Sequence, residues 1–132
     1  MSQSSEYLFV YGTLLRQSQS PVSQMLSSHS SFIEKGSVRG QLFDIGEYPG
    51  IVIDEDSRDE VRGEVFKLKN ADPLLAKLDS YEGKEYKRVK TYVYLDNGDH
   101  LIAWIYNFTH PTDGYISIKS GDYMAYLGLV VS

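Results

Sequence analysis

Short apolar runs separated by polar or glycine-containing segments dominate this chain, and they predict mainly β-strands. Most of these runs are rich in Val, Ile, Tyr and Phe, the residue types that strands favour. We expect strands near residues 7–10, 32–35, 38–45, 51–53, 61–68, 86–95 and 100–106. The last two flank Asn97-Gly98, which is a strong signal for a two-residue hairpin turn.

Apolar residues recur at helical spacing in two places, so we expect two short helices. Ser20-Pro21 provides an N-cap and a first-turn proline for a helix that should end near Ser28. Asp72-Pro73 repeats this pattern, and Gly83 stands where a C-terminal cap belongs. The apolar stripe of this second helix consists of Leu74, Leu75, Leu78 and Tyr81.

Residues 38–43 and 61–66 have similar sequences, VRGQLF and VRGEVF. Two copies are too few for a repeat protein, so we interpret them as paired strands of one sheet. Each contains a glycine, which is tolerated at a barrel bend or where a ligand approaches the backbone. We interpret the acidic run at residues 54–60 as a solvated hairpin tip. Six to seven strands with two short helices, in no regular alternation, predict an α+β fold with a curled, barrel-like sheet.

Size, charge and cysteine content exclude several kinds of protein and several kinds of site for this chain. A chain of 132 residues forms one domain, residues 1–132. It has no cysteine, which excludes disulfides, thiolate metal sites and a cysteine nucleophile. A net charge of −5 argues against a nucleic-acid partner. Residues 1–6 are polar, so we expect a flexible tail without a secretion signal, and no apolar run approaches the ~20 residues of a membrane helix. We therefore expect a cytoplasmic protein with no membrane partner.

The strand at residues 7–10 runs directly into Tyr11-Gly12-Thr13-Leu14. A strand that breaks at a glycine exposes successive backbone N–H groups, and such a turn can hold a carboxylate or an oxyanion. Taken alone, this segment is more often a simple tight turn. A single acid about seventy residues later, Glu82 within the segment LDSYEG at residues 78–83, changes that interpretation.

Together the two segments resemble the gamma-glutamylcyclotransferase-like family, most closely its gamma-glutamylamine cyclotransferase or AIG2-like branch. The resemblance covers residues 7–126, because further family-like pieces recur in order. These are Pro49-Gly50, residues 61–65, Tyr86-x-Arg88, Trp104-x-Tyr106 and residues 115–121. It implies a small mixed barrel with a central cavity, and an enzyme without cofactors that cyclises a gamma-glutamyl group to 5-oxoproline and releases an amine.

In that family the YG[ST]L turn grips the gamma-glutamyl group. The resemblance therefore implies that the N–H groups of Gly12, Thr13 and Leu14 hold the substrate α-carboxylate, with one further contact from the Thr13 hydroxyl. Tyr11 alternates away from the core-facing neighbours of its strand, so we expect its ring to form a wall of the pocket. Tyr115 matches the spacing of the family's C-terminal substrate-contacting tyrosine, although among eleven tyrosines a packing role is an equal alternative.

Glu82 is the candidate general base and acid. A glutamate is usually a surface residue. Here the end of a helix disfavours a negative charge and desolvation in a cavity would do the same, so the pKa of this carboxyl should be raised. Cyclisation requires a base to deprotonate the substrate ammonium and an acid to protonate the departing amine, and one carboxyl can do both. The sequence indicates neither a metal site nor a serine hydrolase. The three histidines lie far apart along the chain, and the G-x-S-x-G elbow of such hydrolases is absent from the sequence.

Besides the enzyme, two alternatives remain open. The first is a non-catalytic or regulatory domain that binds a small carboxylate and would also keep the YGTL turn. The second is a purely structural interaction domain. The presence of Glu82 argues against both.

The sequence departs from the family pattern in the loop at residues 15–19, which lacks the glycine that many relatives have there. The leaving amine of the substrate is open: it could be an amino acid, a peptide, a lysine side chain or a polyamine. We expect a monomer or a weak oligomer.

Overall fold

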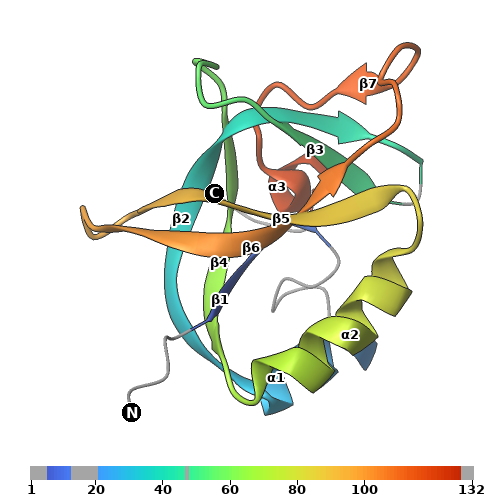
Figure 1. Cartoon of the computed structure of the whole chain (residues 1–132). Coiled ribbons are helices and arrows are strands. Elements are labelled where there is room, and N and C mark those ends of the chain that lie inside the picture. Colours follow the sequence, from blue (N-terminus) through green and yellow to red (C-terminus); the bar gives the residue numbers. More distant parts are fainter. Residues whose placement is uncertain (1–5, 13–20, 47, 129–132) are drawn as a thin grey trace.

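The computed structural model describes residues 6–12, 21–46 and 48–128, and its elements are shown in Figure 1. In chain order they are β1 (Tyr7–Val10), α1 (Pro21–Ser28), β2 (Ser30–Asp44), β3 (Pro49–Ile53), β4 (Glu60–Leu68), α2 (Ala71–Glu82), β5 (Tyr86–Leu95), β6 (His100–Phe108), β7 (Ile116–Ser117) and α3 (Tyr123–Tyr126).

Five strands close into a small barrel in the order β1, β4, β2, β3 and β6, with β6 pairing back onto β1. The pairings of β6 with β1 and with β3 are parallel, and the other pairings around the barrel are antiparallel. Strand β5 forms a hairpin with β6 and also pairs with β2, and β7 pairs with β2. The expected mixed, barrel-like α+β fold is confirmed.

Strand β2 is one strand of 15 residues where the sequence predicted two. Its first part pairs with β4 and its last part with β3, so it bends around the barrel and changes neighbour near Gly40. A Cβ atom at Gly40 would lie 2.5 Å from the carbonyl oxygen of Val52, so a glycine is required for this close approach between backbones. Gly36 and Ser37 interrupt the apolar pattern, so the sequence predicts two separate strands on either side of them.

The two similar segments at 38–43 and 61–66 do lie in paired strands, with Val38 opposite Val61. The hairpin expected between residues 53 and 61 is wrong, because β3 and β4 lie on opposite sides of β2 and residues 54–60 cross from one to the other. This connection is solvated, as expected. The amide of Gly40 donates to the Asp59 carbonyl, which ties the connection to β2.

Helix α1 has the predicted bounds within the described residues, and α2 ends at the predicted Gly83, whose φ is 82°. The start of α2 differs. Its N-cap is Asn70, which adopts a left-handed conformation, and Asp72 lies inside the first turn instead of capping it. Helix α3 and strand β7 were not predicted, because they are only four and two residues long.

The interior is filled by apolar side chains from β1, the barrel strands and α2, which lies beside α1 (Figure 1). Leu8, Phe9 and Val10 are all at most 2% exposed, so β1 is buried on both faces. Leu74, Leu75 and Leu78 anchor α2, whereas Tyr81 at the end of the stripe is exposed. Of the helices in the described part of the chain, none has the length and apolar character that crossing a membrane would need.

Glu6 belongs to the folded part of the chain, although we had assigned it to the tail. Its carbonyl oxygen accepts a hydrogen bond from the Leu68 amide at 2.9 Å, and its carboxylate accepts one from the Trp104 indole at 3.0 Å. The other residues of the expected tail lie outside the described residues.

Candidate active site

The end of α2 and the end of β1 meet at one pocket, although they lie about seventy residues apart in the sequence. The pocket is lined by Phe9, Val10, Tyr11, Gly12, Tyr48, Pro49, Glu82 and Tyr106. Its empty space is about 340 Å³, including the open mouth. Three of the predicted site residues, Tyr11, Gly12 and Glu82, are therefore neighbours.

Glu82 is the last residue of α2 and contributes an acid to a largely apolar wall. Burial raises the pKa of its carboxyl from 4.5 to about 7. The direction agrees with the expectation from the sequence, and desolvation, one of the two expected causes, accounts for it. A carboxyl with this pKa is partly ionised near neutral pH and can both accept and donate a proton.

Gly12 is fixed by packing rather than by an unusual backbone conformation. Its φ is not positive, but a Cβ atom at this position would lie 2.6 Å from the Pro49 side chain. The turn after β1 thus packs closely against the start of β3. Thr13 and Leu14 lie outside the described residues, so the carboxylate-binding role of their N–H groups stays a prediction.

Tyr11 is 6% exposed and belongs to the core, so the alternation that we inferred for it is wrong, because β1 is buried on both faces. Its ring nevertheless lines the pocket as expected. The hydroxyl donates to the carbonyl oxygen of Tyr106 at 2.6 Å and accepts from the Ile51 amide at 3.4 Å. These bonds hold the ring in place, and burial followed by the nearby Glu82 charge raises the pKa of Tyr11 well above its usual value.

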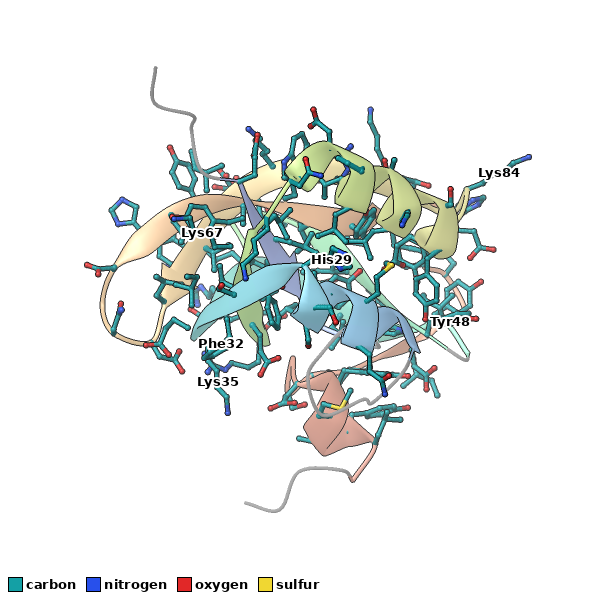
Figure 2. All side chains as sticks on the ribbon, turned by 90° about the horizontal axis from the view of Figure 1, so that it is seen from below. His29, Phe32, Lys35, Tyr48, Lys67 and Lys84 are labelled. Atoms are coloured by element: carbon teal, nitrogen blue, oxygen red, sulfur yellow. The ribbon has the colours of Figure 1, made fainter. Side chains whose placement is uncertain are left out.

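A second hollow adjoins the first on the outer side of Glu82. Its lining residues are Tyr48, Tyr81, Glu82, Gly83, Lys84, Glu85 and Tyr86. The empty space is about 700 Å³ with its mouth, and Tyr48 and Lys84 lie on the same side of the molecule (Figure 2). Because Tyr48 and Glu82 line both hollows, the Glu82 side chain stands where the two meet.

Sequence reasoning did not assign Tyr48 to the site, and it interpreted Tyr86 and Tyr106, which lie on predicted strands, as barrel-lining residues or members of cross-strand pairs. Tyr86 is indeed opposite Phe108, with ring centroids 5.5 Å apart. Its hydroxyl also donates to the Pro49 carbonyl at 2.7 Å, beside the pocket. The position of Tyr48 directly before Pro49-Gly50, one of the family-like pieces, was the available signal for it.

Tyr115 lies elsewhere. It is not among the residues that line either hollow, its side chain is 42% exposed, and its ring packs edge-on against Phe108 with centroids 6.1 Å apart. This placement fits the packing alternative. Within residues 6–12, 21–46 and 48–128, no three His, Asp or Glu side chains gather as a metal site would require.

Comparison with known proteins gives one family. The model of the family described as "Gamma-glutamyl cyclotransferase, AIG2-like" matches residues 8–125. A protein of Methanocaldococcus jannaschii named "Putative gamma-glutamylcyclotransferase" is 30% identical over 125 residues, which are 93% of this chain and 99% of that protein.

Solved structures agree with this fold. The crystal structure of YkqA from Bacillus subtilis superposes with a TM-score of 0.73 at 28% identity over 95% of this chain, which spans only 43% of YkqA. That of an AIG2-like protein from Mus musculus superposes with a TM-score of 0.74 at 22% identity, covering 92% of this chain and 89% of the mouse protein.

Proposed function

This chain belongs to the gamma-glutamyl cyclotransferase, AIG2-like family, and we propose that it cyclises a gamma-glutamyl group to 5-oxoproline with release of an amine or amino acid. Glu82 acts as the base and then as the acid, and the reaction needs no cofactor. The substrate is a small gamma-glutamyl compound.

The observation that carries this proposal is the position of Glu82 where two hollows meet, together with its pKa of about 7. An acid-base group in this reaction has to reach both the attacking α-nitrogen and the leaving nitrogen. In this proposal the gamma-glutamyl part occupies the hollow beside Gly12, and the departing amine points into the hollow beside Tyr81 and Lys84. The carboxyl of Glu82 then reaches the nitrogen on each side.

The carboxyl of Glu82 carries out every proton transfer of the proposed reaction. Ionised Glu82 takes a proton from the substrate α-ammonium, and the freed nitrogen attacks the γ-carbonyl carbon to form a tetrahedral intermediate. Glu82 returns its proton to the leaving nitrogen as the bond from this carbon to that nitrogen breaks and the carbonyl reforms. The ring nitrogen still carries one proton too many, and Glu82 takes this proton and passes it to the released amine, which leaves as an ammonium ion. Since nucleophile and electrophile belong to one molecule, the pocket has to hold a bent conformer and stabilise the oxyanion with fixed N–H donors.

The first test is to incubate the protein with a panel of gamma-glutamyl amino acids, peptides and amines and to detect 5-oxoproline by mass. We expect at least one compound to give product, and Glu82→Gln to lower the turnover number by about 10²-fold or more while ligand binding persists. Glu55→Gln, at an exposed position in the loop at 54–60, is the matched control and should turn over normally.

Two results would contradict the proposal. Normal turnover by Glu82→Gln would remove this carboxyl from the mechanism. Affinity for 5-oxoproline or a gamma-glutamyl analogue without product from any compound would instead identify a non-catalytic binding domain of the same fold.

A further inference from the structure

Asp79 lies three residues before Glu82 in α2, and the structure gives it two partners from the barrel. Two nitrogens of the Arg88 guanidinium each donate to one oxygen of the Asp79 carboxylate, with N–O distances of 2.8 and 3.2 Å, and we call this paired contact a fork. The Tyr106 hydroxyl donates to the same carboxylate at 2.7 Å. Asp79 thus joins the helix that carries Glu82 to strands β5 and β6.

The strand register explains why both partners reach one carboxylate. Arg88 and Tyr106 are directly opposite each other in the antiparallel β5–β6 pair, so their side chains leave the sheet on the same face. The next pair on that face is Lys90 and Trp104, and the Arg88 guanidinium lies 4.3 Å from the Trp104 ring centroid. The guanidinium is therefore oriented from two sides, by a carboxylate and by an aromatic ring.

The same group of residues reaches the pocket. Tyr106 is 4% exposed, it lines the pocket together with Glu82, and its carbonyl oxygen accepts a hydrogen bond from the Tyr11 hydroxyl. Burial, then Asp79 and more weakly Glu82, raise the pKa of the Tyr106 phenol, which stays a neutral hydrogen-bond donor. One residue therefore belongs both to the contacts around Asp79 and to the lining of the pocket.

We propose, on the basis of the function proposed above, that Asp79, Arg88 and Tyr106 form a positioning unit for Glu82. It fixes the last turn of α2 against β5 and β6, and it neutralises a carboxylate that would otherwise oppose ionisation of Glu82. None of the three residues has to touch the substrate's reacting atoms.

The need for neutralisation follows from helix geometry. Side chains three residues apart on a helix have Cβ atoms about 5–6 Å apart, so Asp79 and Glu82 are neighbours. An unpaired carboxylate at that distance disfavours a second negative charge. Burial would raise the pKa of Asp79, but the hydrogen bonds from Arg88 and Tyr106 outweigh it and lower that pKa, so Asp79 is ionised and paired when Glu82 titrates.

Other ionisable groups also surround Glu82. In the described part of the chain, those that line one of the two hollows are Tyr11 after β1, Tyr48 before β3, Tyr81 in α2, Lys84 and Glu85 after α2, Tyr86 on β5 and Tyr106 on β6. Asp79 in α2 bonds to Tyr106 and to Arg88 on β5. Tyr11, Tyr86 and Tyr106 remain neutral at the pH of the test, because burial raises the pKa of each. Substitutions at Asp79 and Arg88 therefore change the local charge without altering this background.

The test is an NMR titration of the Glu82 side-chain carboxyl carbon in protein labelled with ¹³C at glutamate, with the resonance assigned by its loss in Glu82→Gln. In Arg88→Gln the Asp79 carboxylate has no cation, so we expect the Glu82 pKa to rise by about 0.5 unit, the effect of a unit charge about 6 Å away in a water-like medium. In Asp79→Asn the unpaired guanidinium should lower it by a similar or smaller amount, and the double variant should return close to wild type.

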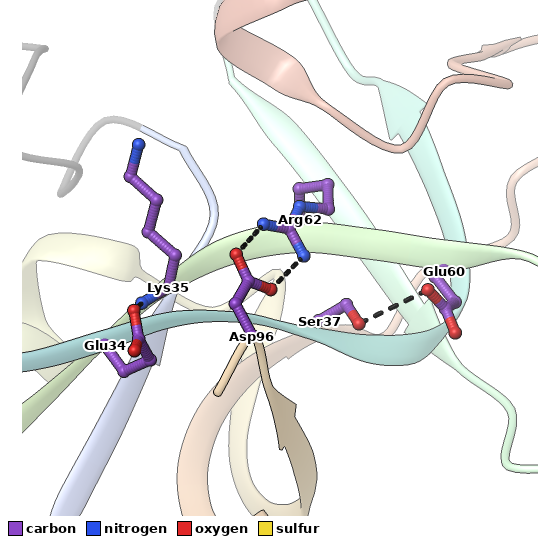
Figure 3. A network of polar contacts seen from close by, with 6 residues as sticks. All are labelled: Glu34, Lys35, Ser37, Glu60, Arg62 and Asp96. Carbon is purple, nitrogen blue, oxygen red and sulfur yellow. Dashed lines mark hydrogen bonds and ion pairs between the residues drawn. The ribbon is translucent and has the colours of Figure 1, made fainter. Parts of the chain in front are cut away.

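Two further variants separate this role from a general loss of structure. Arg88→Lys keeps the cation and should leave the Glu82 pKa within 0.2 unit, about the precision of such a titration. Arg62→Gln removes a matched fork, in which Arg62 binds Asp96 at 2.8 and 2.7 Å on another part of the barrel (Figure 3). That fork does not line either hollow, and its loss should leave the titration unchanged.

Shifts of the same sign in Arg88→Gln and Asp79→Asn, or no shift in either variant while circular dichroism shows a folded protein, would overturn the proposal. The titration needs no substrate. If no gamma-glutamyl compound gives product, the proposed reaction fails, but opposite shifts would still support the positioning unit. If product forms, the acid limb of kcat/KM should move with the measured pKa in each variant.

Discussion

The carboxyl that we assign to proton transfer should also make the folded protein less stable at neutral pH. Burial raises the pKa of Glu82 from the ordinary 4.5 to about 7. A carboxyl whose pKa is higher in the folded than in the unfolded chain favours folding while it is protonated. That contribution is complete below the unfolded value and is lost as the pH rises through the folded value.

The size of the effect follows from the two pKa values. Their difference of about 2.5 pH units corresponds to about 3 kcal/mol of unfolding free energy at 1.36 kcal/mol per unit. Replacing Glu82 with Gln removes the ionisation but keeps the shape of the side chain. We therefore expect Glu82→Gln to be about 3 kcal/mol more stable than wild type at pH 8 and only about 1 kcal/mol more stable at pH 5.

The assay is urea denaturation of both proteins at pH 5 and pH 8, followed by circular dichroism. A fixed cost of burying the Gln amide is the same at both pH values, so it cancels when the two stability differences are compared. Glu55→Gln, at an exposed position, should change the unfolding free energy by less than about 0.5 kcal/mol at either pH. An equal stability difference at pH 5 and pH 8 would refute the raised pKa and, with it, the physical basis for Glu82 as a base near neutral pH.

Three further substitutions test the pocket and its support. Gly12→Val places a side chain against Pro49, so we expect a loss of about 1–3 kcal/mol in stability and weaker calorimetric binding of 5-oxoproline; unchanged affinity in the folded variant would exclude the turn from the site. Tyr11→Phe leaves the Tyr106 carbonyl without its 2.6 Å partner and should cost about 1–3 kcal/mol in urea denaturation, with an unchanged midpoint as the contrary result. Leu78→Ala empties a fully buried position under α2 and should cost about 2–5 kcal/mol; a loss below 1 kcal/mol would show that α2 is not anchored there.

The sequence predicted the local elements well because their signals are local. Asn97-Gly98 marks the β5–β6 hairpin, and the glycine after Glu82 ends α2 as expected. The expected two-residue turn is wrong, because the Leu95 amide donates to the Asp99 carbonyl and the loop between these two residues is one residue longer, with Gly98 at a φ of 95°. The other errors arise where distant pairing decides. Nothing near residues 54–60 indicates that β2 lies between the two strands that they connect, so the run looked like a hairpin.

The site shows the same division. Glu82 and Gly12 could be proposed from sequence because each lies in a recognisable segment, whereas Tyr48 and Tyr106 reach the pocket only through the closure of the barrel. The upward shift of the Glu82 pKa was predicted, with desolvation as one of its causes, but its size was not, because the degree of desolvation depends on what covers the helix end. The fork between Asp79 and Arg88 depends on strand register in the same way.

The closure of the barrel by β6 has a consequence for synthesis of the chain. Within the described residues, strand β1 pairs with β4 and β6, and its contact to β6 joins Leu8 to Trp104. During synthesis on the ribosome, nearly a hundred further residues therefore have to be added before β6 can pair with the second edge of β1. Such non-local pairing is slow. Until then, a strand that is apolar on both faces remains open to other nascent chains. The pocket cannot exist before Tyr106 emerges, so nascent chains stopped short of β6 should bind no ligand and should be held by chaperones that recognise exposed apolar strands.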